Sequence, residues 1–397
     1  MSSLSEFTEE IRDFLSDKLT PELRHFGEAF TGYDCPRPVA EEWTGILDDQ
    51  GWSVPGWPVE HGGTGWSTEQ LVIFKRELAL AHAPRMAVQG VDMVGPVVIE
   101  FGTDEQKAAL LPRIRRGNDW WAQGYSEPGA GSDLASLKCR AVRDGEDYIV
   151  NGTKIWTTYA HECNKIFCLV RTSNEGKPQA GISFFMFDLD LPGIEVRPIL
   201  TFGGEHDFNQ VVFTDVRLPG AALLGRENEG WTVSKFLLVG ERAYSYAVYV
   251  HDYLERIRDF VNQRASGSLS PMQAPALRAK LASIEVELAS LDAMEQKTLE
   301  LMKRDKGAAS ALASVSKIHG SVLRQRASEL AVEMMGVYAV PQQPRLMEQG
   351  SLHKLIGEPT ANTAVAVSQY FSDRAMTIAS GTTEVQKNII ASRVLGL

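Results

Sequence analysis

Residues 147–160 read DYIVNGTKIWTTYA and carry the strongest strand pattern in the central part of the chain. β-branched and aromatic residues are typical of strands, and Asn151-Gly152 between two apolar runs predicts a hairpin turn. Short apolar runs bounded by turn residues follow, at KIFCLVRT (165–172), GISFFMFDLD (181–190) and NQVVFTDVRLP (209–219). These runs predict an antiparallel β-domain over residues 121–227, built as a barrel or a sandwich.

Helical patterns lie on both sides of this β-region. Residues 1–120 are predicted as helices separated by glycine-rich loops, and Thr68 is the expected N-cap of a helix over 68–83. A Gly-Thr-Asp start, acidic residues in the first turn and basic residues in the last predict another helix over 102–117. Long helical patterns return over residues 228–397. The order along the chain is therefore helices, strands and a helical bundle.

Charge and composition narrow the class of protein. A formal net charge of −11 disfavours nonspecific binding to nucleic acid or anionic lipid. The four cysteines contain no C-x-x-C pair and are too sparse for a disulfide scaffold. The acidic N-terminal segment fits neither a secretory signal nor a mitochondrial transit peptide, and no apolar run is long enough to span a membrane. We therefore expect a cytoplasmic protein that binds neither nucleic acid nor membrane.

The segment YSEPGAGSDLASL (125–137) opens the predicted β-region. Gly129 and Gly131 allow a ligand to approach the backbone closely, and Ser126 and Ser132 offer hydroxyl and amide donors. The third glycine, preceding strand and following helix of a dinucleotide-binding fingerprint are missing, so that interpretation is weak. A tight polar loop is the alternative.

The segment NGTKIWTT (151–158) follows. Trp156 and Thr158 alternate along the predicted strand and so share one side of it. An indole plane beside a hydroxyl donor suits a flat heteroaromatic ring with acceptors on its edge. A core tryptophan is the alternative.

These motifs, followed by NQVVFTDVRLP with GRENEGW and by IASGTTEVQKNIIASRVLG, strongly resemble the acyl-CoA dehydrogenase family. The resemblance runs in order over essentially the whole chain. It implies an α+β multidomain fold: an N-terminal helical domain over 1–120, the central antiparallel β-domain over 121–227, and a C-terminal four-helix bundle over 228–397. FAD would lie between the β-domain and the bundle.

The resemblance also implies which residues hold the cofactor. The segments Tyr125–Ser126 and Trp156–Thr158 would bracket the isoalloxazine, with Ser126 and Thr158 bonded to its edge. The flavin phosphates and the substrate pantetheine would lie near Gly131 and Ser132. A C-terminal flavin-contacting segment matches Gly381, Thr382 and Glu384.

The reaction implied by the resemblance is FAD-dependent α,β-dehydrogenation of an acyl-CoA thioester. A carboxylate removes the α-proton while the β-hydride moves to flavin N5. The usual base is a Glu directly before Gly-Thr, but Ser380 stands there in this chain. A minority of the family places the base on a helix before an Arg, which matches Glu241 and Arg242. Arg242, Ser132 and Ser380 would contact the substrate.

Glu241 has its own support in the sequence. Leu237, Glu241, Tyr244 and Val248 recur at helical spacing and share one face, where an unpaired buried Glu is rare. A partly exposed Glu or a structural ion pair is the alternative. Glu384 lies four residues past the usual base position and is expected to be a flavin or structural contact.

Other readings of function stay open at this point. The same fold serves acyl-CoA oxidases and flavin monooxygenases, and a non-catalytic subunit that only binds a CoA ester is a third possibility. Glu241 argues against that third reading. The physiological acceptor implied by the family is an electron-transfer flavoprotein.

Two departures from the family concern assembly. The Arg-x-x-Phe-Gly motif that holds a neighbour's FAD in homotetramers is absent around Arg264 and Ser268, although either could substitute in part. The double-glycine segment reads Met-Met-Gly-Val-Tyr over 334–338. These departures resemble catalytic subunits of bacterial heterotetramers that act on steroid side-chain acyl-CoA thioesters, and Ala379 would leave room for a bulky acyl group. We therefore expect an α₂β₂ heterotetramer with a paralogous subunit.

Overall fold

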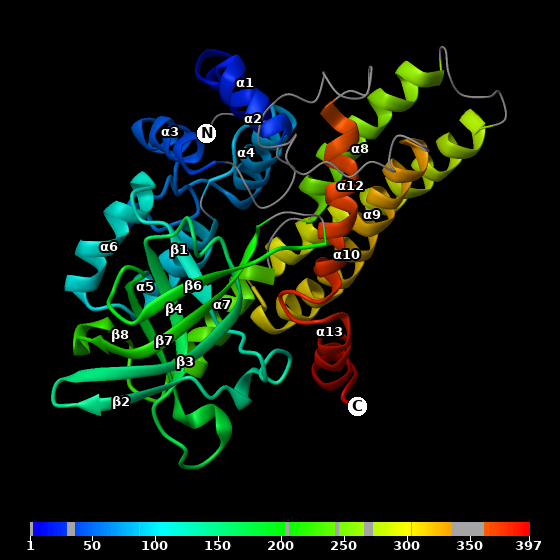
Figure 1. Cartoon of the computed structure of the whole chain (residues 1–397). Coiled ribbons are helices and arrows are strands. Elements are labelled where there is room, and N and C mark those ends of the chain that lie inside the picture. Colours follow the sequence, from blue (N-terminus) through cyan, green and yellow to red (C-terminus); the bar gives the residue numbers. More distant parts are fainter. Residues whose placement is uncertain are drawn as a thin grey trace.

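The computed structural model describes residues 3–29, 36–86, 88–202, 206–242, 246–265, 273–302, 304–335 and 361–397. A helical region, a β-region and a second helical region follow one another along the chain, with the long helices of the C-terminal region packed side by side (Figure 1). This order confirms the predicted fold class. Within these ranges, no helix combines the length and the apolar character that a membrane span requires.

The N-terminal region is helical as predicted. The helix predicted over 68–83 begins one residue earlier than expected, because Ser67 rather than Thr68 is the N-cap. The Ser67 hydroxyl accepts a hydrogen bond from Gln70 N (3.2 Å), and the Gln70 side chain accepts one from Ser67 N (2.9 Å), which makes a capping box. The helices are α1 (Leu4–Lys18), α2 (Pro21–Ala29), α3 (Arg37–Asp49), α4 (Thr68–Leu80), α5 (Gly95–Phe101) and α6 (Asp104–Arg116).

The strands form one sheet with the order β6-β7-β3-β2-β4-β5-β8, and β1 pairs with β4. Most neighbouring strands pair antiparallel, as predicted. The exceptions are β1, which lies parallel to β4, and β2, which meets β4 in parallel at Arg140 and Arg171. A parallel pair needs a long connection, and the loop after β1 together with β2 and β3 supplies it. The strands are β1 (Trp121–Gly124), β2 (Arg140–Asp144), β3 (Asp147–Thr158), β4 (Lys165–Arg171), β5 (Ile182–Asp188), β6 (Ile194–Ile199), β7 (Phe208–Leu218) and β8 (Leu223–Leu224).

The hairpin predicted at Asn151-Gly152 is also wrong, because β3 runs straight through both residues. The turn lies earlier, between β2 and β3, where Gly145 has a φ of 66°. Gly152 instead occupies a register shift with a φ of 150°, and a Cβ there would lie 2.6 Å from Cys139 Cα. Glycine is required at this position by the close approach of two strands rather than by a turn.

Strands β4 and β5 are buried on both faces and divide the core of the β-region. One face packs on the N-terminal helices and α7, with Phe167 and Phe184 in that cluster. The other face packs against β3 and β7, where the Tyr148 and Phe185 rings lie 4.9 Å apart. The motif-bearing strand β3 is therefore fixed to the centre of the domain.

The C-terminal region is a bundle in which α8, α9, α10 and α12 share one apolar core over the described residues. Figure 1 shows α13 beside α10, next to the C-terminus. The helices are α7 (Gly230–Arg242), α8 (Tyr246–Ala265), α9 (Gln273–Met302), α10 (Lys306–Met335), α12 (Ala361–Ser372) and α13 (Thr383–Ile390), with a 3₁₀ turn at Asp373–Thr377.

Candidate functional site

The loop after β1 folds into a tight turn with its glycines outward. Glu127 and Ala130 exchange two backbone hydrogen bonds (2.9 and 3.0 Å) around Pro128 and Gly129. A Cβ placed on Gly129 or Gly131 would meet no atom within 4 Å, and Ser132 is exposed. The backbone of this loop therefore faces open space, as close approach of a ligand requires.

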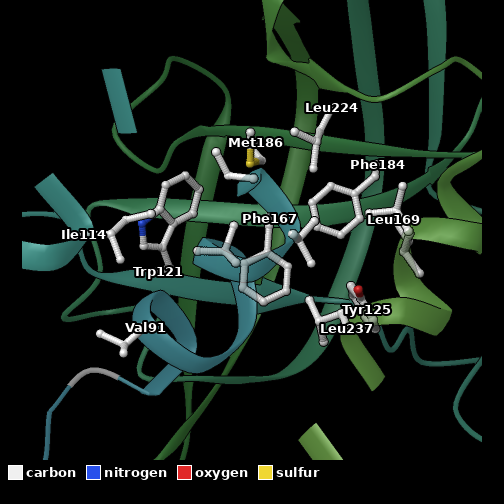
Figure 2. Packing of buried hydrophobic residues seen from close by; sticks show 14 of the residues in the cluster. Val91, Ile114, Trp121, Tyr125, Phe167, Leu169, Phe184, Met186, Leu224 and Leu237 are labelled. Atoms are coloured by element: carbon white, nitrogen blue, oxygen red, sulfur yellow. The ribbon is translucent and has the colours of Figure 1, made fainter. Parts of the chain in front are cut away.

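Tyr125 anchors the start of this loop. Its ring is buried and lies edge-on to the rings of Phe167 (5.9 Å between centroids) and Phe184 (6.4 Å) (Figure 2). The side chain of Tyr125 therefore belongs to the core. The backbone of Tyr125 and the half-buried Ser126 are the groups that could contact a ligand here.

Trp156 has the geometry of a binding residue rather than of a core residue. Its side chain is 57% exposed, between the fully buried Lys154 and Thr157. It has a φ of 59°, at a register shift where β3 carries one more residue than β7. Bulges and positive φ values at bulky residues concentrate at functional sites. The alternative of a core tryptophan is wrong, and Thr158, two residues further on, is half-buried.

A buried ion pair that the sequence did not reveal joins the two motifs. Lys154 Nζ, fully buried, lies 2.8 Å from Glu127 Oε1 and donates a hydrogen bond to the carbonyl of Tyr125 (3.2 Å). The Glu127 carboxylate also accepts from the backbone N–H groups of Lys138 (2.7 Å) and Cys139 (2.9 Å). Both residues lie inside the quoted motifs, and a lysine in the middle of a predicted strand was the available signal.

The C-terminal segment around Ser380 has an unusual backbone conformation. Ser380 and Gly381 both have positive φ values (56° and 87°), and the Gln386 amide donates to their carbonyls (3.2 and 3.3 Å). Thr382 caps α13 by accepting from Val385 N (3.2 Å). Helix α13 packs on α10 and on the turn at Ala391–Leu395, so the segment is anchored to the C-terminal bundle.

Glu384 lies in the first turn of α13 and is exposed. Hydrogen bonds from its own backbone N–H and from the Thr382 hydroxyl, with Lys387 and Lys317 nearby, hold its pKa below the usual 4.5. Because a lowered pKa makes a carboxylate a weaker base, this residue suits a structural role better than proton abstraction.

A buried carboxylate fixes the turn that precedes Ser380. Asp373 is fully buried, and Arg324 Nε lies 2.6 Å from its Oδ1. The Gln325 side chain donates to the carbonyl of Asp373 (2.9 Å) and to the hydroxyl of Thr377 (3.3 Å). This network ties residues 373–377 to α10. No local sequence pattern indicates it, because its members come from two segments that are distant in the chain.

Comparison with known proteins places the chain in a family. Family models match residues 2–118 (acyl-CoA dehydrogenase, N-terminal domain), 122–216 (middle domain) and 228–395 (C-terminal domain). Acyl-CoA dehydrogenase IpdE1 of Mycobacterium tuberculosis is 34% identical over 404 residues, which cover 100% of this chain and 98% of that protein. The chain belongs to the acyl-CoA dehydrogenase family. Members of this family are flavoproteins and oxidoreductases.

Solved acyl-CoA dehydrogenase structures resemble the whole chain. The Tcur3481-Tcur3483 steroid ACAD is 29% identical with a TM-score of 0.83, over 99% of this chain and 97% of that chain. The ChsE4-ChsE5 complex from Mycobacterium tuberculosis is 30% identical with a TM-score of 0.82, over the same shares. Both neighbours cover all three regions of the acyl-CoA dehydrogenase fold.

The helix that carries Glu241 and Arg242 is α7, and both residues lie at its C-terminal end. Leu237, one turn earlier, is buried in the same cluster as Tyr125 (Figure 2). The structure describes the backbone of Glu241 and Arg242 but not their side chains, and Tyr244 lies outside the described residues. Helix α7 thus contributes to the apolar cluster that contains Tyr125, at the start of the loop expected to bind flavin in an acyl-CoA dehydrogenase.

Proposed function

We propose that this chain is an FAD-dependent acyl-CoA dehydrogenase that oxidises the α,β-bond of an acyl-CoA thioester, with Glu241 as its base. The observation that carries the proposal is the joined pair of motifs. The exposed, strained Trp156 and the open loop at Gly129 and Gly131 are held together by Lys154 and Glu127.

These residues fit a flavin. An exposed indole offers a flat apolar wall, and Thr158 and Ser126 offer polar groups beside it. The open backbone around Gly131 and Ser132 suits phosphates, which backbone N–H groups bind well. Gly381, Thr382 and Glu384 would complete the flavin contacts. FAD, when bound, supplies the acceptor for the β-hydride.

The protein's part in the reaction is to bind, orient and deprotonate. The Glu241 carboxylate takes the α-proton as the α-C–H bond breaks, while Ser380 N–H polarises the thioester carbonyl, which makes that proton more acidic. Arg242 and Ser132 would hold the thioester. Burial of the base against the flavin and the acyl chain would raise its basicity, because loss of water disfavours the charged carboxylate.

Anaerobic addition of acyl-CoA to the purified flavoprotein tests the proposal. Bleaching of the visible flavin absorption is expected, because hydride transfer reduces the ring. Slow reoxidation in air is expected of a dehydrogenase and fast reoxidation of an oxidase. Absence of bleaching with every thioester would indicate a subunit that only binds CoA esters.

Trp156→Ala is expected to weaken FAD retention about tenfold and to shift the flavin absorption, because the aromatic wall is removed. The measurement is the FAD content and visible spectrum of the purified protein. Trp156→Phe, which keeps an aromatic face, should retain most of both. Unchanged content and spectrum in Trp156→Ala would show that the indole does not touch the cofactor.

The proposed substrate is a bulky or steroid side-chain acyl-CoA, and the proposed electron acceptor is an electron-transfer flavoprotein. The substrate is supported by Ala379, which is exposed beside Ser380, and by the resemblance to a steroid ACAD. Turnover of short, branched and steroid CoA thioesters with an artificial acceptor tests the substrate class.

We also propose that the active form is an α₂β₂ heterotetramer with a paralogous subunit, which the resemblance to the ChsE4-ChsE5 complex supports. Because the chain lacks the Arg-x-x-Phe-Gly motif, a homotetramer would lack the charge-assisted hydrogen bonds that this motif makes to a neighbour's FAD. Each such hydrogen bond is worth roughly 1.5–3 kcal/mol. The side chain of Arg264, Ser268 and residues 336–338 lie outside what the structure describes.

This chain, when expressed without a partner subunit, should have a low flavin content as measured by mass and absorbance. A fully active homotetramer with one FAD per chain would contradict this prediction.

A further inference from the structure

Two histidines far apart in the sequence stack beside the Trp156 bulge. The rings of His161 and His206 lie 3.8 Å apart between centroids and 14° from parallel. His161 follows β3 and His206 precedes β7, so the stack spans the pair of strands that carries the bulge. The Tyr159 hydroxyl donates to Asp207 Oδ1 (2.8 Å) in the same cluster.

Asn209 connects this stack to the backbone of the bulge. It is fully buried and pairs with Thr157 across the sheet. Its Nδ2 donates to the carbonyl of Thr157 (3.1 Å) and lies 3.1 Å from His161 Nδ1, while its Oδ1 lies 2.8 Å from His206 Nε2. Because Nδ2 is a donor, His161 Nδ1 must accept, and because Oδ1 is an acceptor, His206 Nε2 must carry hydrogen.

Protonation would therefore affect the hydrogen bonds of the two histidines differently. His206 can gain a proton on Nδ1 and still donate from Nε2 to Asn209. His161 cannot gain one, because an N–H at Nδ1 would face the N–H of Asn209. Protonation of His161 would turn the amide away from Thr157, whose neighbours are Trp156 and Thr158.

We propose that neutral His161 is a positioning residue that acts through Asn209 to hold the Trp156–Thr158 segment in its flavin-binding conformation. This inference rests on the proposed function only in naming the flavin as the ligand. The hydrogen-bond network itself is a property of the chain.

The surroundings of His161 favour the neutral ring. Loss of water around the ring, and then the charge of His206, lower the pKa of His161 below its usual 6.5. They outweigh the charge of Glu162, the hydrogen bond with Asn209 and the charge of Asp207, which act in the opposite direction. The Arg37 guanidinium donates a hydrogen bond to the carbonyl of Glu162 (2.8 Å), the residue after His161. A lowered pKa in the folded state means that the stabilisation is present above pH 6.5 and is lost as the pH falls through the folded value.

Hydrogen exchange of the peptide containing residues 155–160 in the full chain tests the proposal. Protection in the wild type, corrected for intrinsic exchange, is expected to fall about fivefold from about pH 7.5 to about pH 5.5. His161→Gln keeps an acceptor for Asn209 but does not titrate, so protection should stay near the neutral wild-type value at both pH values. His161→Ala should lose protection at both.

The matched control is His251→Gln, because His251 pairs with Asp292 (2.6 Å) in the C-terminal bundle and does not contact the bulge. This control should keep the wild-type pH response at residues 155–160. A wild type without a pH response, or a His161→Gln variant with the full response, would overturn the proposal.

FAD retention at the same two pH values separates this proposal from the proposed function. Retention should fall at acidic pH in the wild type and less in His161→Gln. If the chain bound no FAD but the exchange results held, the proposed function would fail and the positioning role would stand. If FAD bound normally and the exchange results failed, the positioning role would be wrong.

Discussion

Glu241→Gln is expected to lower the rate of flavin reduction by acyl-CoA by about 10²–10⁴-fold while FAD and ligand binding persist. The amide cannot accept the α-proton and keeps nearly the same shape as the carboxylate. The measurement is anaerobic single-turnover reduction, which isolates the chemical step from product release.

Glu384→Gln and Ser380→Ala are the controls for this prediction. Glu384 is exposed and has a lowered pKa, so its loss should change the rate of reduction little. Ser380 would act through its backbone N–H, which alanine retains. Near-normal turnover in Glu241→Gln, or a large loss in Glu384→Gln, would assign the base elsewhere.

Lys154→Met should lower the free energy of unfolding by about 3–5 kcal/mol, because it leaves the Glu127 carboxylate buried without its partner. Denaturant unfolding of the purified chain measures this loss. The loop after β1 should also lose its register on β3, since Lys154 holds the carbonyl of Tyr125. FAD content should therefore fall together with stability.

A surface pair and a double variant sharpen this prediction. Lys280→Met removes a lysine paired with Glu333 at 2.6 Å, both about half exposed, and should change stability by about 0–1 kcal/mol. Lys154→Met with Glu127→Gln should recover part of the loss, because no charge remains buried. Equal effects of Lys154→Met and Lys280→Met would mean that the buried pair does not hold the loop.

Local signals in the sequence located most helices and strands correctly. The helix predicted over 102–117 is α6, with Thr103 in a capping box with Gln106 and Gly117 closing its C-terminus. The predicted apolar runs are β4, β5 and β7. These features depend on residues a few positions apart, so the order of helices, strands and bundle could be predicted from the chain alone.

The way in which these elements meet at the site depends on contacts between distant parts of the chain. Asn151-Gly152 has the composition of a turn, but the approach of Cys139 to Gly152 keeps β3 extended there. Four features of the site depend on residues that are distant in the sequence. They are the parallel pairing of β1 with β4, the positive φ of Trp156, the ion pair of Lys154 with Glu127 and the hydrogen bond of Asn209 with His161. Motifs read from the chain identified which residue types were available to the site. Their exposure, strain and partners were set by contacts between strands, because no local pattern encodes the energy of a contact made tens of residues away.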